Sequence, residues 1–172
     1  MTDSTPARLT PAERAALVDL YRDGHRVVVE ALAGTTAAEL DAQPPDPDEW
    51  TARMVVHHLA DSEMMSAMRL RRLIAEDDPV IQGYDEPLFA RRLFYDDRPI
   101  EPALAALGAA RATTFQILER LTDDQWARTG THTESGRYGV EDWLRIYGAH
   151  AHEHAAQIGR AIAEHRLAAG EA

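Results

Sequence analysis

Apolar residues recur at spacings of three and four along four long stretches of this chain, which is the pattern of amphipathic helices. The first stretch begins at Thr10, where the run Thr-Pro-Ala-Glu has the form of a capping box with proline at the first helical position. We expect this helix to end at Gly34, because glycine is a common helix stop. Its apolar positions are Leu17, Leu20, Tyr21, Val27, Val28 and Leu32.

A second helix is expected over residues 51–76. The proline-rich run 43–47 before it cannot be helical, and Pro79 ends it. Residues 77–87 are rich in acidic and turn residues and indicate an irregular connection, while 88–94 is a candidate for a short extra helix.

The third helix begins near Pro99 or Pro102 and carries apolar residues as far as Leu121. Residues 122–126 have the form of a second capping box and predict a single helical turn. The polar segment 127–138 contains two glycines and indicates a loop or a small hairpin.

The fourth helix is expected from Val140 to Leu167. We find no internal repeat, no low-complexity run and no strong strand pattern. The sequence therefore predicts one domain spanning residues 1–172, of the all-α class. Its architecture is expected to be a four-helix bundle with a long irregular connection between helices two and three.

The composition limits which binding functions and which metal ligands are possible for this chain. The chain has 172 residues, a net charge of −11, no lysine and no cysteine. Nucleic-acid binding is not expected, because it needs a basic surface. Without thiolates, a metal must be held by imidazole, carboxylate or water, which favours Zn, Ni, Fe(II) or Mn. Neither a signal sequence in Met1–Leu9 nor a membrane span is expected, so a cytoplasmic protein is the default.

Three histidines fall on apolar faces of the predicted helices. His150 and His154 are one turn apart in the stripe of the fourth helix, and His58 lies on the inward row of the second. Imidazoles brought together in a core are costly to bury, and a bound divalent metal is the simplest way to stabilise them. Two alternatives stay open: the histidines are ordinary surface residues, or they hydrogen-bond in the bundle without a metal.

Other polar residues lie close to these histidines in the sequence. His57 differs in direction from His58 by about 100° and is expected at the side of the helix, and His152 is expected to face solvent. His25 fits a core or boundary position better than a fourth ligand. Asp61, one turn after His58, is a candidate to orient an imidazole or to act as a general base on a metal-bound water, or is an exposed carboxylate paired with an arginine.

Two segments resemble the DinB-like family of four-helix-bundle metalloenzymes. In 50–63 a histidine, His58, precedes Leu-Ala-Asp, and in 150–158 His154 lies three residues before Gln-Ile, with His150 one turn earlier. The middle of the chain is similar as well, so the resemblance spans nearly all of it. The further matching runs are 69–72, 76–79, 84–85 and 139–144.

This resemblance implies one divalent metal, often zinc or nickel, held by one histidine of the second helix and an HxxxH pair of the last. It implies a homodimer in many members. It does not imply a single reaction: some relatives use a low-molecular-weight thiol as cosubstrate, and others have no assigned activity. It gives no reason to expect DNA binding.

Two classes of function follow. The first is a metal-dependent enzyme that acts on a small-molecule substrate, with the three histidines as ligands and Asp61 as the nearest candidate base. Thiol transfer is the first reaction we consider and hydrolysis the second, with Arg69 or Arg111 as a candidate to hold an anionic substrate group. The second class is a non-catalytic, metal-stabilised bundle that binds a small molecule or a protein partner. Metal occupancy is expected to fall as the pH drops through the ordinary histidine range, near a pKa of about 6.5.

Overall fold

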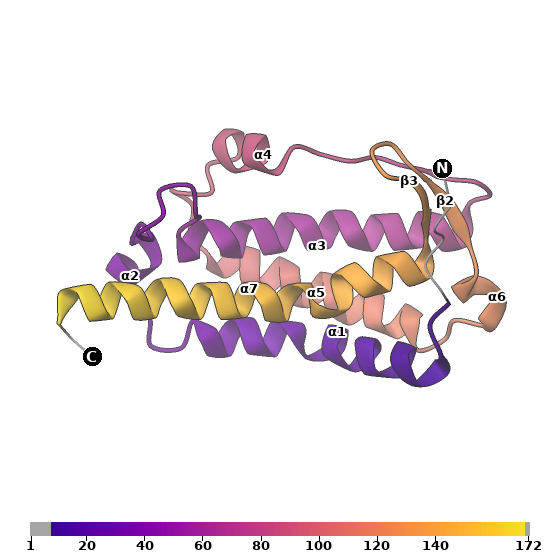
Figure 1. The fold of residues 1–172 in the computed structure, drawn as a ribbon, viewed down its shortest axis with the longest axis horizontal. Coiled ribbons are helices and arrows are strands. Elements are labelled where there is room, and N and C mark those ends of the chain that lie inside the picture. The colour runs from indigo at the N-terminus through magenta and orange to yellow at the C-terminus, as the bar shows by residue number, and fades with distance from the viewer. Residues whose placement is uncertain (1–7, 171–172) are drawn as a thin grey trace.

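The four predicted long helices are present and lie side by side in an elongated bundle (Figure 1). The computed structural model describes residues 8–170, so most of the segment in which no signal sequence was expected lies outside the described residues. The bundle helices are α1 (Pro11–Ala31), α3 (Ala52–Ala75), α5 (Glu101–Leu118) and α7 (Val140–Ala169). Helices α1 and α3 each pack against both α5 and α7. The all-α four-helix bundle is thereby confirmed.

Shorter elements connect these helices. They are α2 (Ala37–Asp41), β1 (Val80–Ile81), α4 (Glu86–Arg92), α6 (Asp123–Trp126), β2 (Thr129–His132) and β3 (Gly136–Gly139). The connection between α3 and α5 runs along α3 and carries α4 and β1 (Figure 1). Within the described part of the chain, no helix is long and apolar enough to cross a membrane.

Threonine caps start two of the long helices. The Thr10 hydroxyl accepts a hydrogen bond from the Glu13 amide, as predicted, and Thr51, at the start expected for the second helix, caps α3 in the same way by accepting from the Met54 amide. Helix α2 is not among the predicted elements, although its capping box is visible in the sequence as Thr36 followed three residues later by Glu39.

Of the loop or small hairpin predicted for residues 127–138, the hairpin is present: residues 129–139 pair with Thr129 opposite Gly139 and His132 opposite Gly136. The short strand β1 in the connection is not among the predicted elements. Strand β1 of the connection pairs in parallel with β2, which makes a sheet of three strands in the order β1-β2-β3. The strands are only two to four residues long, too short for a clear alternating pattern. The sheet ties the long connection to the start of α7.

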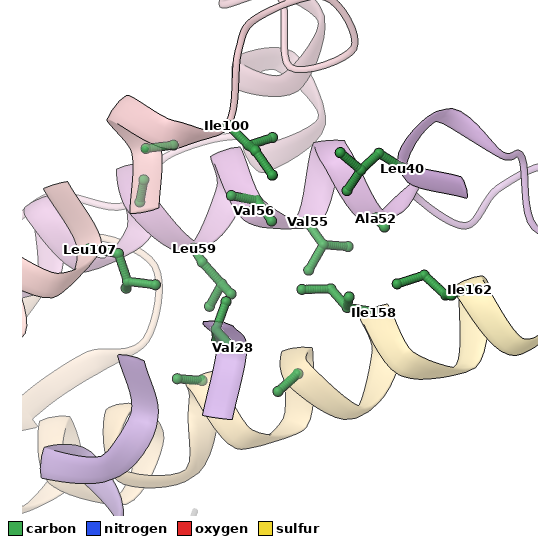
Figure 2. Packing of buried hydrophobic residues seen from close by; sticks show 14 residues of the cluster. Val28, Leu40, Ala52, Val55, Val56, Leu59, Ile100, Leu107, Ile158 and Ile162 are labelled. Atoms are coloured by element: carbon green, nitrogen blue, oxygen red, sulfur yellow. The ribbon is translucent and has the colours of Figure 1, made fainter. Parts of the chain in front are cut away.

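The core consists of two apolar clusters separated by buried polar side chains. Figure 2 shows the first cluster, in which Val55 and Leu59 of α3 and Ile158 of α7 are fully buried or nearly so. The second cluster is built around Trp143 and Leu70. The polar residues of α3 that lie between the two clusters along the helix are Ser62, Glu63 and Ser66.

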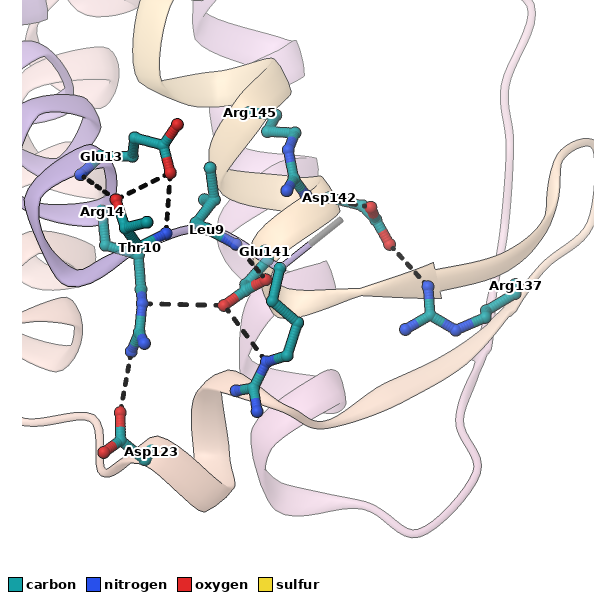
Figure 3. Close-up of polar contacts among 10 residues, drawn as sticks. Leu9, Thr10, Glu13, Arg14, Asp123, Arg137, Glu141, Asp142 and Arg145 are labelled. Carbon is teal, nitrogen blue, oxygen red and sulfur yellow. Dashed lines mark hydrogen bonds and ion pairs between the residues drawn. The ribbon is translucent and has the colours of Figure 1, made fainter. Parts of the chain in front are cut away.

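An ion-pair cluster joins the start of α7 to α1 and to the hairpin (Figure 3). The buried Glu141 carboxylate accepts a hydrogen bond from the Leu9 amide at 3.0 Å and lies 3.6 Å from the Arg14 guanidinium. The neighbouring Asp142 accepts from the Gly139 amide at 2.8 Å and pairs with Arg137. These carboxylates sit in the first turn of α7, where the helix dipole favours negative charge, and they hold that end of the helix in place.

Candidate metal centre

His58, His150 and His154 meet between α3 and α7. One ring nitrogen from each lies within 4.8 Å of the others. The ring centroid of His58 is 5.5 Å from that of His150 and 4.9 Å from that of His154, and the two α7 rings are 4.6 Å apart. They meet because α3 packs against α7 and because four residues bring His150 and His154 onto the same face. His58 is buried, and the other two rings are half-buried.

A neighbouring amide fixes the orientation of one ring. The Nδ1–H group of His154 donates a hydrogen bond of 2.7 Å to Oε1 of Gln157, one turn later on α7. The proton on Nδ1 leaves the lone pair of the ring on Nε2. This is the arrangement in which a metal-binding histidine is held by a partner behind it.

Burial keeps the other two rings neutral. It lowers the pKa of His58 to about 4, with a further contribution from the charge of His154. It lowers the pKa of His150 to about 3, with contributions from His154, His58 and Arg111. Both imidazoles are therefore deprotonated at neutral pH, which is the form that binds a metal.

The residues fit a divalent cation. Three imidazole nitrogens converge, and among residues 8–170 neither His58 nor His150 makes a hydrogen bond through its ring. No hydrogen bond between the three rings is present in that range either, which does not favour the alternative of a metal-free, hydrogen-bonded cluster. Three protein ligands would leave further positions of a bound ion open, as in catalytic zinc sites.

His57 is buried, contrary to the expected position at the side of the helix. The long connection crosses α3 and covers it. Nη2 of Arg98 donates to Nδ1 of His57 at 3.2 Å, and Nε2–H of the same ring donates to the Arg98 carbonyl oxygen at 3.1 Å. Both ring nitrogens are engaged by one residue, so His57 fastens the connection to α3 and has no free lone pair for a metal.

Asp61 lies on the side of His57 rather than among the three histidines. Its Oδ2 accepts a hydrogen bond of 2.6 Å from the hydroxyl of Tyr95, a residue of the connection. The Asp61 charge raises the pKa of His57, but it does not contribute to the lowered pKa of His58. The role of Asp61 as a base stays a prediction, and this placement does not favour it.

Two further histidines lie outside the cluster. His25 of α1 faces Gly108 of α5, where an added Cβ would lie 3.0 Å from its Nε2, which agrees with the boundary position expected for it. His152 was expected to face solvent. It is half-buried instead, because its Nε2–H donates to the Leu20 carbonyl oxygen of α1 at 3.0 Å.

The two candidate arginines differ in their surroundings. Arg111 is 2 % exposed and forms a salt bridge of 2.6 Å with the buried carboxylate of Glu63, so it is not available to an anionic substrate group. It also donates to the Tyr21 carbonyl oxygen at 3.0 Å and 2.6 Å, and the Tyr21 hydroxyl donates to Glu63. Arg69 is half-buried and donates a hydrogen bond to the hydroxyl of Tyr147. The ring of Tyr147 in turn contacts His150.

The buried network of Glu63, Arg111 and Tyr21 is not predicted from the sequence. One signal was available: Arg111 lies between Leu107 and Leu118 on the apolar row of α5, so a buried position followed from the spacing. Nothing in the sequence identified Glu63 as its partner, because that pairing depends on how α5 packs against α3.

Comparison with known proteins places these features in a wider group. The sequence profile of the DinB superfamily matches residues 9–158. A protein of Oceanobacillus iheyensis named "Putative metal-dependent hydrolase OB0782" is 38 % identical over 109 residues, 63 % of this chain and 63 % of the relative. YfiT of Bacillus subtilis, also named "Putative metal-dependent hydrolase", is 34 % identical over 132 residues, 75 % of this chain and 72 % of that protein.

The fold has a solved counterpart. The structure of Bacillus subtilis YfiT, described as "a probable metal-dependent hydrolase with an unusual four-helix bundle topology", superposes with a TM-score of 0.86 at 26 % identity. The superposition covers 98 % of this chain and 94 % of that one. The likeness therefore includes the helices that carry all three histidines.

Proposed function

This chain belongs to the DinB superfamily, and we propose that it is a metal-dependent enzyme in which His58, His150 and His154 hold one divalent ion. The observation that carries the proposal is the convergence of three imidazole nitrogens within 4.8 Å. The names of the relatives support it, since those proteins are described as metal-dependent hydrolases. The all-nitrogen donor set favours Zn or Ni first, with Fe(II) or Mn as alternatives.

When bound, such an ion supplies Lewis-acid chemistry: it lowers the pKa of a coordinated water or thiol to near neutrality and polarises a substrate carbonyl. Hydrolysis and thiol transfer both begin with such a nucleophile. The names of the relatives favour water as the nucleophile, whereas thiol transfer rests on the family resemblance alone.

The protein's own residues prepare the site for this chemistry. Gln157 holds His154 with Nε2 free, and burial holds His58 and His150 in their neutral forms. Trp50 packs against the ring of His58 at a centroid distance of 5.0 Å and covers one side of the cluster. These contacts fix the donor atoms before an ion arrives, which lowers the cost of ordering them.

The first test is the metal content of protein purified without an affinity tag, measured by elemental mass spectrometry. We expect about one Zn, Ni, Fe or Mn per chain, lost in the His150→Ala variant. His152→Ala is the matched control, because it removes a histidine of the same helix that lies outside the cluster. Absence of stoichiometric metal after reconstitution, or its retention in His150→Ala, would overturn the proposal.

The second test separates an enzyme from a metal-stabilised bundle. The metal-loaded protein is assayed against a panel of activated esters and amides, and against an electrophile with a small thiol as cosubstrate. Turnover that disappears on chelation and in His150→Ala supports catalysis and identifies water or thiol as the nucleophile. Stoichiometric metal that raises the unfolding midpoint, with no turnover in either panel, favours the non-catalytic alternative.

A further inference from the structure

A group of hydrogen-bond donors lies between α3, α7, β3 and the long connection, and it includes Tyr147, which is about one helical turn before His150 on α7. Its centre is Arg69 of α3. Nη1 of Arg69 donates to the hydroxyl of Tyr147 at 3.0 Å, and Nη2 donates to the Gln82 carbonyl oxygen at 2.7 Å. The guanidinium also lies over the ring of Tyr84, 5.6 Å from its centroid. An arginine has five N–H groups, so three of them are left for another acceptor.

Two buried tyrosine hydroxyls lie beside this arginine. Among residues 8–170 the hydroxyl oxygen of Tyr138 has no hydrogen-bond partner, and that of Tyr84 has none of ordinary length, although the Ser62 side chain lies close enough to lower its pKa. Burial raises the pKa of Tyr84 to about 12 and also raises the pKa of Tyr138, while the Arg69 charge lowers both. Both hydroxyls are therefore close to Arg69 and protonated at neutral pH. A buried hydroxyl without a partner is costly, and it calls for a ligand or an ordered water.

Among residues 8–170, Arg69 forms no ion pair with a carboxylate. In residues 8–170 no carboxylate oxygen lies within 4.0 Å of its guanidinium, whereas Arg111 has Glu63 at 2.6 Å. The carboxylates that act on the neighbouring tyrosines are Glu86 and Asp142, and the second of these is paired with Arg137.

We propose that Arg69 and the hydroxyls of Tyr84, Tyr138 and Tyr147 bind an oxyanion, the carboxylate or phosphate group of a substrate whose reacting atoms lie at the three histidines. The Tyr147 ring connects the two places, since its centroid is 5.6 Å from that of His150. Ser62, which lies close enough to Tyr84 and Tyr147 to lower the pKa of both, follows His58 by one turn, about 6 Å along α3. The assignment rests on the proposed function, and it narrows the substrate to small molecules with an anionic group.

The test uses metal-free protein, so that the probe cannot bind through an ion. Inorganic phosphate and acetate are titrated separately, and the backbone amide signals of 15N-labelled protein are followed by NMR. We expect saturable shifts around Arg69 and Tyr147 with at least one probe. In Arg69→Leu the affinity should fall at least ~10-fold, because hydrogen bonds to a charged group are lost. Arg160→Gln is the control, since it removes an exposed arginine of α7 and should leave the affinity unchanged.

Tyr138→Phe distinguishes a ligand-binding hydroxyl from a structural one. Removing a buried hydroxyl that has no partner should leave the urea midpoint of the free protein unchanged or higher, while weakening probe binding several-fold. A lower midpoint with unchanged binding would show that the hydroxyl is structural. No saturable binding of either probe, or equal affinity in Arg69→Leu, would overturn the proposal. Metal content is measured separately, so either result leaves the test of the histidine site intact.

Discussion

Gly24 of α1 is the position where the packing of the bundle is least tolerant of an added atom. A Cβ built there would lie 2.5 Å from Nη2 and 2.7 Å from Cζ of Arg111, and 2.8 Å from the Cβ of Ala151 on α7. Gly24→Ala therefore pushes on the arginine of the buried ion pair and on the helix that carries two of the three histidines.

Neither neighbour can move freely. Ala151 moves only with α7, and Arg111 is held by Glu63 and by the Tyr21 carbonyl oxygen. Overpacking a core costs about 1–3 kcal/mol, and disturbing one partner of a buried ion pair costs up to about 3–5 kcal/mol. The better helix propensity of alanine offsets at most about 1 kcal/mol. We expect a net loss of about 2–4 kcal/mol in the free energy of unfolding.

Urea denaturation followed by far-UV circular dichroism measures this loss as a lower midpoint with an unchanged slope. The matched control is Gly159→Ala in α7, where an added Cβ meets nothing within 4 Å. That variant should gain about 0.5–1 kcal/mol from helix propensity alone. If Gly24→Ala is as stable as the wild type, the close approach of α1 to Arg111 is not real and the reasoning fails.

Three further predictions concern the ion pair, a helix cap and pH. Glu63→Leu alone should cost about 3–5 kcal/mol because it leaves Arg111 buried and unpaired, whereas adding Arg111→Leu should restore part of the loss; additive losses in a double-mutant cycle would contradict this. Thr51→Ala should lower the free energy of unfolding by about 1 kcal/mol through loss of the α3 cap, and an unchanged midpoint would exclude that role. Metal-free protein should lose stability as the pH falls below about 6.5. In the unfolded chain the two histidines then bind protons, whereas in the folded protein His58 and His150, with pKa values of about 4 and about 3, stay neutral. The slope is at most about 1.4 kcal/mol per pH unit for each ring, and a flat profile between pH 7.5 and 5 would refute it.

The long helices could be predicted because their signals are local. The capping box at Thr10 and the cap at Thr51 determine where α1 and α3 begin, whatever those helices later contact. The three clustered histidines could be selected for a similar reason: a spacing of four places His150 and His154 on one face, and an apolar row places His58 inward. Once a helical bundle is assumed, local periodicity predicts which face of each helix is buried.

The remaining features depend on contacts between distant segments. His57 is buried only because residues 95–98 of the connection return to α3, and no pattern within 51–76 carries that information. The same connection supplies Tyr95, which donates a hydrogen bond to Asp61. The position of Asp61 one turn after His58 therefore did not show which residue it contacts. The pH range expected for metal loss also changes, because burial in the assembled bundle places the pKa values of His58 and His150 well below 6.5.

The buried pair of Glu63 and Arg111 explains how a cation site and an arginine can share one bundle interior. Arg111 is close enough to His150 to contribute to the lowered pKa of that ring, so its charge alone would oppose a divalent ion there. Glu63 lies 2.6 Å from the guanidinium and is itself buried, so the pair presents little net charge to the histidines. A wholly apolar replacement of such a pair is often at least as stable, so stability alone does not account for it. Loss of Glu63 should therefore weaken folding and cation binding together, because it exposes the three imidazoles to an uncompensated positive charge.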